Sequence, residues 1–315
     1  MSAYKLVTNQ TKELSRLVIH RLRPTNYEAV SVSSLHRTLD IPDDAGAPPV
    51  KLEHGGHIEF RNVAFAYEGH DPVLRGIDLH IQAGRTTAIV GVSGHGKSTM
   101  LNLIMRMAEV SDGAILIDGQ DIRRVAQGDL RSQIAYVNQS FVTFPGTIYY
   151  NIAYGSVSRG ELASKDEVVE AAKAVNLYDT IMERKDGFNA KLNRGGNSMS
   201  GGELQRMGIA RALVRKSPIL LLDEATAALD TATETKIMDY IRNSKDSRTT
   251  VIIAHRISTI MDADQIVVLD HGKVAELGTH SELVAKGGIY ANMWVKTQIS
   301  DVHFPSDEMD EAIAF

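Results

Sequence analysis

The sequence predicts an α/β protein with a buried, mostly parallel sheet. Continuous apolar runs at residues 87–90, 218–222 and 249–254 are typical of strands that are covered on both faces. A helical pattern at residues 233–243 separates two of these runs. Apolar runs that alternate with helices in this way indicate a parallel sheet, and the remaining elements are assigned around it.

The composition is that of a folded chain. The 315 residues could make one large or two ordinary domains, and 43% apolar residues are ample for a core. A net charge of −5 and a pI near 6.1 disfavour nucleic acid as a partner. The absence of cysteine excludes disulfides and zinc–thiolate sites and suits a reducing compartment. No stretch approaches the roughly 20 apolar residues of a membrane-spanning helix, and the N-terminus lacks the pattern of a secretory signal.

The first 39 residues predict a helical extension. Apolar residues recur at roughly helical spacing within residues 2–22, Pro24 ends that pattern, and residues 29–39 predict a second short helix. Two interpretations stay open for the extension. It is either an ordinary helix packed on the domain or a segment that lies near a membrane or partner helices.

A linker, a compact domain and a tail are predicted to follow. Residues 40–56 contain three prolines and three glycines and predict the linker. The domain is expected to begin near His57 and to end at about residue 298. The last residues, 299–315, form an acidic tail.

The elements of the domain are assigned in chain order. Residues 58–67 alternate as a strand should, and residues 73–81 predict a second strand before the apolar run at residues 87–90. The sequence becomes helical at residues 164–215, where Ser164 and Glu167 predict a capping box. The remaining predicted elements are strands at residues 115–119, 134–137 and 266–269 and a helix at residues 202–216.

Residues 91–99, GVSGHGKST, fit the phosphate-binding pattern G-x-x-x-x-G-K-[ST] between a strand and a helix. Glycines let the backbone fold around a phosphate, and successive N–H groups and the helix N-terminus face the anion. Lys97 adds a positive charge near the β and γ phosphates, and Ser98 is expected to place its hydroxyl on Mg²⁺. The residues predicted to contact the nucleotide here are Ser93, Gly94, His95, Gly96, Lys97, Ser98 and Thr99.

Two carboxylates, Asp223 and Glu224, follow the apolar run at residues 219–222. The C-terminal ends of parallel strands are where α/β sheets place their ligand sites. Asp223 can hold Mg²⁺ through water, and Glu224 is placed to polarise an attacking water as a general base. General-base catalysis typically contributes ~10² to 10⁴-fold.

A second anion-binding helix N-terminus is predicted at residues 198–206, SMSGGELQR, where Ser200, Gly201 and Gly202 open a helix. Two phosphate-facing termini in one subunit make sense if two subunits pair head to tail. Each subunit would then cover the nucleotide of the other, which predicts a homodimer.

These motifs together resemble the nucleotide-binding domain of an ATP-binding cassette (ABC) transporter over residues 57–298. The phosphate loop resembles the family's Walker A loop, residues 219–224 its Walker B strand, and the serine with two glycines the core of its signature. The resemblance implies a P-loop NTPase core with a mostly parallel sheet, an N-terminal antiparallel β subdomain and an inserted α-helical subdomain at about residues 140–215.

The resemblance also implies roles for single residues. Tyr67 matches the aromatic that stacks on adenine, an interaction worth ~1 to 3 kcal/mol on comparable platforms. Gln139 resembles the Q-loop glutamine, which in the family touches Mg²⁺ and contacts the membrane domains. Asp230 lies in a stretch that resembles the D-loop, and His255 resembles the switch histidine that contacts the γ-phosphate.

The resemblance extends to the exporter type. Residues 144–152 are similar to the exporter pattern F-x-G-T-I-x-x-N-I, and residues 166–187 resemble the exporter helical region. In exporters this domain follows the last transmembrane helix, whose cytoplasmic extension residues 2–39 would represent. The chain is therefore expected to belong to a half-transporter, on the cytoplasmic or matrix face of a membrane, with transmembrane domains as partners.

Several residues depart from the family pattern. Met199 and Glu203 flank the signature core, and the Glu203 carboxylate is expected to weaken closure of the dimer near the partner's nucleotide. Arg194 stands where exporters usually carry glutamate, which puts the coupling to membrane loops in doubt. Ala227 replaces the usual D-loop serine, and His95 replaces a residue that is more often small.

The predicted function is ATP hydrolysis that drives export, through a dimer that sandwiches two Mg–ATP molecules. One alternative is a soluble cassette ATPase that acts on ribosomes or DNA, and another is a regulatory module that senses ATP without turnover. The transported substrate is not encoded here, because the membrane domains choose it. The predicted catalytic residues are Lys97, Glu224 and His255, the Mg²⁺ ligands are Ser98, Gln139 and Asp223, and Ser200, Gly201, Gly202, Glu203 and Asp230 complete the ATP site.

Overall fold

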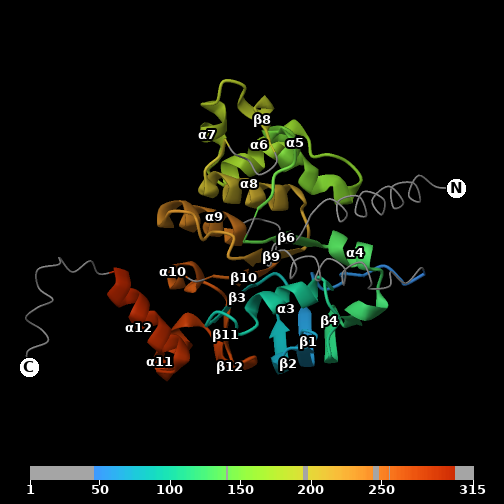
Figure 1. Cartoon of the computed structure of the whole chain (residues 1–315), viewed down its shortest axis with the longest axis vertical. Helices are drawn as coiled ribbons and strands as arrows, with labels where there is room; N and C mark the ends of the chain where they lie inside the picture. The colour runs from blue at the N-terminus through green and yellow to red at the C-terminus, as the bar shows by residue number, and fades with distance from the viewer. Residues whose placement is uncertain (1–45, 140, 194–197, 244–247, 255, 302–315) are drawn as a thin grey trace, which may run out of the picture. The chain divides into compact units, whose positions relative to one another are not determined.

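The computed structural model describes residues 46–139, 141–193, 198–243, 248–254 and 256–301, all within one compact unit (Figure 1). The predicted helices at residues 1–39, the start of the predicted linker and residues 302–315 of the predicted tail lie outside the described residues. Among the described residues, no helix is both long and apolar enough to cross a membrane.

The central sheet has six strands in the order β12-β11-β3-β10-β9-β6. The pairs β6–β9, β9–β10, β10–β3 and β3–β11 are parallel, and β12 pairs antiparallel at the edge. The predicted mostly parallel sheet is therefore confirmed. The strands are β3 (Thr86–Gly91), β6 (Ile134–Val137), β9 (Ile219–Asp223), β10 (Thr249–Ile253), β11 (Gln265–Asp270) and β12 (Lys273–Gly278).

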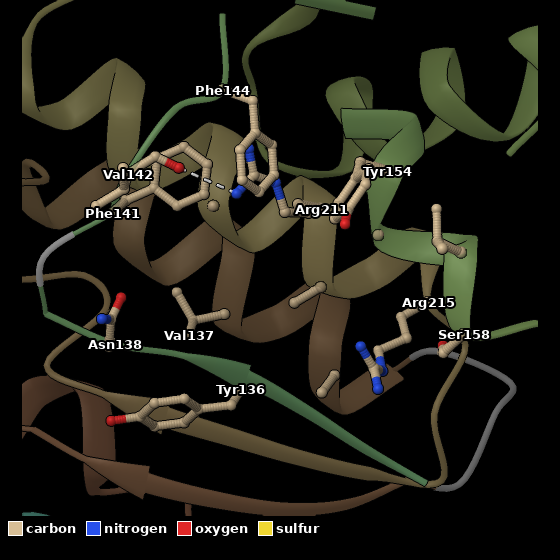
Figure 2. A pocket seen from close by; sticks show the side chains of 15 residues that line it. Tyr136, Val137, Asn138, Phe141, Val142, Phe144, Tyr154, Ser158, Arg211 and Arg215 are labelled. Atoms are coloured by element: carbon tan, nitrogen blue, oxygen red, sulfur yellow. Dashed lines mark hydrogen bonds between the residues drawn. The ribbon is translucent and has the colours of Figure 1, made fainter. Parts of the chain in front are cut away.

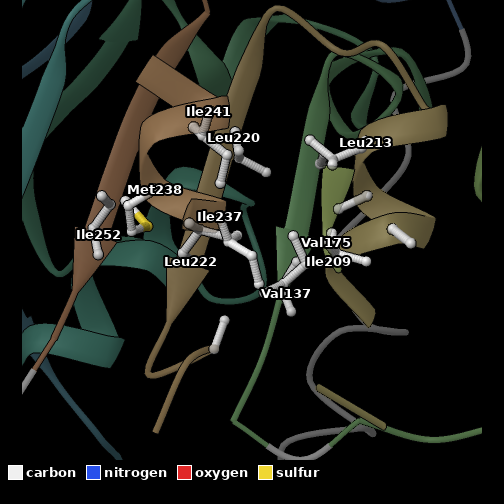
Figure 3. Close-up of a cluster of buried hydrophobic side chains, with 14 of the residues drawn as sticks. Val137, Val175, Ile209, Leu213, Leu220, Leu222, Ile237, Met238, Ile241 and Ile252 are labelled. Carbon is white, nitrogen blue, oxygen red and sulfur yellow. The ribbon is translucent and has the colours of Figure 1, made fainter. Parts of the chain in front are cut away.

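Successive residues of each central strand pack into two different hydrophobic cores. Leu220 and Leu222 of β9 lie in one core, and Ile219 and Leu221 lie in the other. This follows from the two-residue period of a strand, which sends neighbouring side chains to opposite faces. Figure 3 shows Leu220 and Leu222 packed with side chains of the helices on their face of the sheet, among them Ile237. Burial on both faces explains why these strands are continuous apolar runs.

A four-stranded antiparallel sheet in the order β2-β1-β4-β5 lies on the other core. The helix that follows the phosphate loop, α3, packs into the same core through Met100, Leu101 and Ile104. This is the antiparallel subdomain implied by the resemblance. Its strands are β1 (Ile58–Ala66), β2 (Pro72–Ile81), β4 (Asp112–Ile117) and β5 (Gln120–Asp121), and the nearby helices are α3 (Lys97–Ile104), η1 (Ile122–Arg124) and α4 (Gln127–Ser132).

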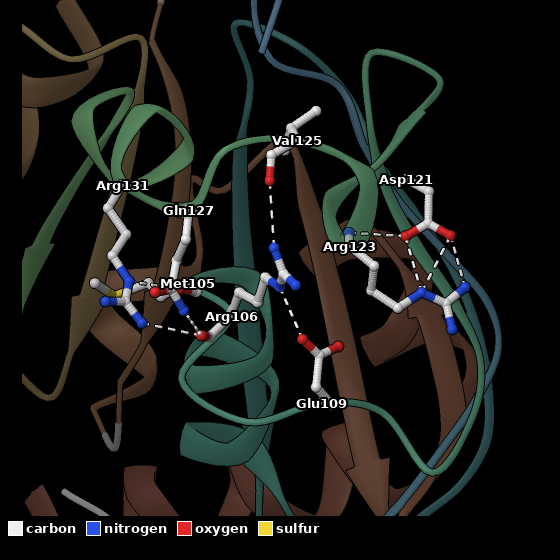
Figure 4. A network of polar contacts seen from close by, with 8 residues as sticks. All are labelled: Met105, Arg106, Glu109, Asp121, Arg123, Val125, Gln127 and Arg131. Atoms are coloured by element: carbon white, nitrogen blue, oxygen red, sulfur yellow. Dashed lines mark hydrogen bonds and ion pairs between the residues drawn. The ribbon is translucent and has the colours of Figure 1, made fainter. Parts of the chain in front are cut away.

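The C-terminal end of α3 is fixed by a polar network (Figure 4). Arg106 follows the helix with a left-handed φ of 50°, and its carbonyl accepts hydrogen bonds from Gln127 Nε2 (2.9 Å) and from the Arg131 guanidinium (3.0 Å). Arg131 also donates to the carbonyl of Met105 (3.1 Å). Carbonyls at a helix end have no intrahelical partner, so these donors hold the helix of the phosphate loop in place.

The helical region stands apart from the antiparallel sheet, on the other side of the central sheet (Figure 1). The capping box predicted for Ser164 and Glu167 is present at the start of α6. A two-stranded ribbon, β7 paired with β8, was not predicted, because strands of two residues carry no periodic signal. The elements are β7 (Gly146–Thr147), α5 (Ile148–Ala153), η2 (Tyr154–Arg159), α6 (Lys165–Ala174), α7 (Tyr178–Met182), η3 (Gly187–Asn189), β8 (Lys191–Leu192) and α8 (Gly201–Val214).

Both ends of the described chain are tied to the domain. In the predicted linker, Val50 is buried and its N–H donates to Asp129 (2.5 Å), while the N–H of Gly56 donates to Asp118 (3.2 Å). At the other end, Tyr290 is fully buried. The helices of the C-terminal half are α9 (Thr231–Asn243), α10 (Ile257–Ile260), α11 (His280–Lys286) and α12 (Ile289–Asp301), so the helix α12 includes the first residues of the predicted tail.

Candidate functional site

The phosphate loop connects β3 to α3, as predicted. Gly91 and Gly96 have φ angles of 147° and 98°, which favour glycine. A Cβ on Gly91 would lie 2.3 Å from the carbonyl oxygen of Leu269, and a Cβ on Gly96 would lie 2.6 Å from Leu74. The loop is thus packed tightly between β11 and β2, and its path requires glycine at both positions.

Lys97 lies at the start of α3 and folds back over the loop. Its Nζ donates to the carbonyls of Gly91 (2.9 Å) and Val92 (3.1 Å). Burial lowers the pKa of Lys97, while the nearby carboxylates of Glu224 and Asp223 oppose that shift. The buried Lys97 ammonium group therefore lies near two carboxylates, and this arrangement suits the binding of a charged ligand.

Ser98 and Asp223 are 125 positions apart in sequence and are brought together by the fold. The Ser98 hydroxyl donates to Asp223 Oδ1 at 3.0 Å, and the Tyr136 hydroxyl donates to Asp223 Oδ2 at 3.3 Å. Burial raises the pKa of Asp223, and the two hydroxyl donors oppose that shift. A hydroxyl and a carboxylate side by side are the oxygen ligands that Mg²⁺ prefers, so the donor set fits that ion.

Gln139 and Glu224 form a second contact at this end of the sheet. Gln139 Nε2 donates to Glu224 Oε2 at 2.8 Å. Glu224 has a left-handed φ of 50°, and its N–H donates to the carbonyl of Ile253 at 3.0 Å. A left-handed backbone at a non-glycine residue is uncommon and clusters at functional sites.

Tyr67 lies beside the first turn of α3. Its hydroxyl is 3.3 Å from Oγ1 of Thr99, and Phe65 packs against its ring edge with the ring centroids 4.8 Å apart. The Tyr67 side chain is 38% exposed. An accessible ring next to the phosphate loop is suited to stacking on a base.

The signature serine caps α8 in a capping box. Ser200 Oγ accepts from the N–H of Glu203 (3.2 Å), and Glu203 Oε2 accepts from the N–H of Ser200 (2.6 Å). The other carboxylate oxygen of Glu203 pairs with Arg184 at 2.7 Å. Burial alone would raise the pKa of Glu203, but the hydrogen bonds from Ser200 and Arg184 outweigh it and lower the pKa. The Glu203 carboxylate thus faces its own helix and Arg184, a contact that the sequence analysis missed although the S-x-x-E pattern was present.

Asp230 caps the N-terminus of α9. Its Oδ1 accepts from the N–H of Thr233 at 2.9 Å at the start of α9, and this bond lowers the pKa of Asp230. The neighbouring Ala228 N–H donates to Gln205 of α8 at 2.8 Å. The signature helix therefore contacts the segment before α9, while α3, which follows the phosphate loop, packs into the core on the other side of the central sheet (Figure 1).

Two predicted positions have no described geometry. The switch histidine, His255, and the departure at Arg194 lie outside the described residues.

Arg256, the residue after His255, is described and belongs to a hydrogen-bond network that was not predicted from the sequence. Glu234, 3% exposed, accepts hydrogen bonds from Thr226 (2.5 Å), Thr259 (2.7 Å) and Arg256 (3.1 Å). This network connects α9 to the segments that follow β9 and β10.

Arg211 of α8 organises the segment after Gln139. It donates to the carbonyl and side chain of Asn151 (2.7 and 2.8 Å) and to the carbonyl of Val142 (3.1 Å). Its guanidinium lies over the rings of Phe141 and Phe144, 4.3 and 4.7 Å from their centroids. Burial lowers the pKa of Arg211 to about 10, so the cation persists at neutral pH. Its role was also missed by sequence reasoning, because no local pattern connects α8 to that segment.

The comparisons with known proteins agree with this geometry. Residues 74–227, which run from β2 through the phosphate loop to the segment after Glu224, match the family described as ABC transporter. The chain belongs to the ABC transporter family. The family and the P-loop fold predicted from the sequence are both confirmed.

Curated ABC relatives and a solved structure extend this likeness. The chain is 41% identical over 285 residues to "Iron-sulfur clusters transporter atm1, mitochondrial" of Neurospora crassa, covering 88% of this chain and 39% of the relative. It is 44% identical over 262 residues to "ATP-dependent lipid A-core flippase" of Yersinia pestis, covering 82% of this chain and 44% of the relative. The structure of a bacterial Atm1-family ABC exporter with ATP bound matches with a TM-score of 0.78 and 42% identity, over 86% of this chain and 47% of that chain. The chain thus spans less than half the length of these proteins.

Proposed function

We propose that this chain is the ATP-hydrolysing domain of an ABC exporter. Two hydrogen bonds at the start of α3 and the ends of β6 and β9 carry the proposal: Ser98 donates to Asp223, and Gln139 donates to Glu224. These contacts support the proposal that Ser98, Asp223 and Gln139 bind Mg²⁺ and that Glu224 is the general base. The relatives described above are named as transporters and a flippase, so the soluble alternative gains no support.

Each residue has a distinct role in the proposed reaction. Lys97 and the loop N–H groups bind the phosphates, and Tyr67 stacks on the base. Ser98 and Asp223, with Gln139, would hold Mg²⁺, which neutralises charge on the β and γ phosphates. Glu224 takes a proton from the attacking water. His255 is proposed to steady the γ-phosphate.

The proposed active form is a head-to-tail homodimer. Ser200, Gly201 and Gly202 begin α8, whose N-terminal N–H groups are suited to bind a phosphate of the partner's ATP. Because each chain would complete the other's site, ATP binding would close the dimer and hydrolysis would reopen it. Such closure is a way to shift attached membrane domains between two conformations.

An apolar surface between β6 and the helical region is proposed to bind the transmembrane domains (Figure 2). It surrounds a cavity of about 470 Å³ over Arg211, and the exposed side chains Val142, Phe144, Tyr154 and Val157 lie on it. Exposed large apolar groups that cluster in this way mark interaction sites. The missing partner is proposed to be the remainder of the transporter, because the relatives are more than twice as long as the part that this chain covers. The domain would then lie at the cytoplasmic or matrix face of a membrane.

The hydrolysis proposal is tested with Glu224→Gln, which keeps the size of the side chain and removes the base. The variant is expected to bind ATP, to lose turnover by ~10² to 10⁴-fold, and to accumulate as a dimer with ATP. Turnover is measured by phosphate release and dimerisation by sedimentation. Equal hydrolysis by the two proteins would rule out Glu224 as the base.

The membrane partner is tested separately in the full-length transporter. Val142→Asp places a charge on the proposed surface and is expected to lower the transport rate and the stimulation of ATPase activity by substrate, while the isolated domain keeps its basal ATPase. Leu162→Asp, at another exposed apolar residue of the helical region, is the matched control. A Val142→Asp transporter that works as well as the control would contradict the proposed surface.

A further inference from the structure

Three side chains that the proposed catalytic mechanism does not use meet beside the phosphate loop: His95, Asp270 and His271. One nitrogen or carboxylate oxygen from each lies within 4.8 Å of the other two. His95 Nδ1 is 3.4 Å from Asp270 Oδ1, and His271 Nε2 is 3.9 Å from the same oxygen. The two imidazole rings have centroids 4.8 Å apart.

The backbone holds these side chains together without help from a ligand. Asp270 ends β11 and His271 begins the turn to β12, while β11 pairs with β3 up to Leu269 opposite Gly91, where the phosphate loop starts. The turn is also attached to β2, because the N–H of Arg75 donates to the carbonyl of Gly272 at 2.9 Å. Ligands on such fixed segments need little reorganisation to bind an ion.

His95 Nδ1 faces a backbone N–H donor and a carboxylate oxygen at the same time. Nδ1 accepts a 3.3 Å hydrogen bond from the N–H of His271, which requires a free lone pair. The same lone pair faces the carboxylate of Asp270 at 3.4 Å, and the two electron-rich atoms repel each other. A cation bound to both atoms removes that repulsion, because each then directs a lone pair at positive charge. Since Nδ1 has a single lone pair, the long contact from the His271 N–H gives way to the ion.

We propose that His95, Asp270 and His271 bind a divalent transition-metal ion of the zinc class. Two ligand atoms that each lie about 2.1 Å from a tetrahedral ion are about 3.4 Å apart, which matches the separation of His95 Nδ1 and Asp270 Oδ1. Two imidazoles and one carboxylate favour Zn²⁺, Ni²⁺ or Cu²⁺, whereas Mg²⁺ prefers oxygen ligands alone. This site is therefore distinct in chemistry from the Mg²⁺ site proposed at Ser98 and Asp223.

The site is open to solvent and attached to the ATP site. The side chain of His271 is 79% exposed and that of Asp270 38%, so an ion can enter and a fourth position remains for water. A bound ion would join the phosphate loop to the β11–β12 turn through His95, which stands between Gly94 and Gly96. Metal binding is measured without nucleotide, so the metal-site proposal can be wrong while the ATPase proposal is right. The ATPase proposal can likewise be wrong while the metal site is present.

The test titrates the tag-free full chain with Co²⁺, whose visible absorption reports coordination. We expect a single bound Co²⁺ that Zn²⁺ displaces and excess Mg²⁺ does not. His95→Ser and His271→Asn should each weaken Co²⁺ binding at least about tenfold, because loss of a direct ligand costs no less than loss of a group that supports one. Asparagine is chosen at residue 271 because it tolerates the left-handed φ of 45° there. Unchanged melting temperatures without metal show that both variants fold.

The matched control is His57→Ala on the antiparallel sheet. His57 and His80 also stack, with ring centroids 5.6 Å apart, and His80 Nε2 is 3.9 Å from a Glu59 oxygen. Glu59 is already paired with Arg61 at 2.7 Å, so this group is expected to bind no Co²⁺ tightly. The proposal is overturned if the wild type shows no Co²⁺ spectrum in excess metal, or if His57→Ala weakens binding as much as His95→Ser does.

Discussion

Gln139 and Glu224, 85 positions apart in the sequence, are joined by a hydrogen bond of 2.8 Å between Nε2 and Oε2. Gln139 follows β6 and Glu224 follows β9, and these strands are parallel neighbours in the central sheet. The backbone of Glu224 is fixed as well, because its N–H donates to the carbonyl of Ile253. The proposed base is thus held through both its main chain and its carboxylate.

We expect Gln139→Ala to lower ATP turnover by ~10- to 100-fold, because misplacing a catalytic group by about 1 Å can cost on the order of 10²-fold. The apparent affinity for ATP should change less, since the phosphate loop is untouched. Steady-state phosphate release and binding of a fluorescent ATP analogue separate the two effects. Gln133→Ala, at the end of α4, is the control. Turnover equal to that of the control would show that the contact does not position Glu224.

The contact between Tyr136 and Asp223 predicts a pH effect. Burial raises the pKa of Asp223, and the hydroxyls of Ser98 and Tyr136 hold it down by bonding the charged form. Tyr136→Phe removes one donor, so the pKa should rise further and the ionised carboxylate needed for Mg²⁺ should be lost at a higher pH. The acid limb of ATP turnover is expected to move up by about one pH unit, since a bond to a charged group is worth about 1.5 kcal/mol and one unit about 1.4 kcal/mol.

The measurement for Tyr136→Phe is turnover against pH at saturating ATP and limiting Mg²⁺. Tyr150→Phe removes an exposed hydroxyl from α5 and should leave the acid limb unchanged. If the acid limbs of the wild type and Tyr136→Phe coincide, the ionisation of Asp223 does not determine the acid limb.

Local patterns were sufficient to predict the central-sheet strands other than β12, and the phosphate loop. Residues 87–90 and 219–222 are continuous apolar runs because both faces of these strands are buried, and Gly91 and Gly96 are fixed by the tight packing of one loop. Both Ser98 and Asp223 were assigned to one predicted Mg²⁺ site, and their side chains are hydrogen-bonded in the structure.

Contacts between distant elements could not be predicted. Arg211 and Asn151 are 60 positions apart, and no spacing rule relates them. The strand β12 was also missed, because its residue types do not follow its burial: Glu276 is buried and Leu277 is exposed. The capping box of Ser200 and Glu203 could have been predicted, since the same pattern identified the capping box of Ser164 and Glu167. It was missed because Glu203 was interpreted from the family signature, as a carboxylate near the partner's nucleotide.

The buried carboxylate of Glu234 predicts a large stability effect. It accepts hydrogen bonds from Thr226, Thr259 and Arg256, so Glu234→Ala removes the acceptor of two threonine hydroxyls and the ion pair with Arg256. We expect the free energy of unfolding to fall by about 1 to 3 kcal/mol, the scale for leaving buried polar groups without their hydrogen-bond partner. Urea unfolding measures this, with Glu170→Ala on the exposed face of α6 as a control that should change stability by less than about 0.5 kcal/mol. A cost no larger than that of the control would show that Glu234 contributes no net stabilisation.

The pair of Arg184 and Glu203, 2.7 Å apart, leads to a prediction about dimer closure. In the proposed dimer, Glu203 lies in the first turn of the helix that faces the partner's phosphates, and Arg184 balances its charge. Arg184→Met should therefore weaken ATP-induced dimerisation by about fivefold, equivalent to about 1 kcal/mol for a partly exposed charge. Glu203→Gln keeps the capping box, because glutamine also serves at that position, and removes the charge. The double variant should then regain the dimer affinity of the wild type, as measured by sedimentation in the Glu224→Gln background with ATP. A double variant as weak as Arg184→Met alone would mean that Arg184 acts on closure by a route other than the charge of Glu203.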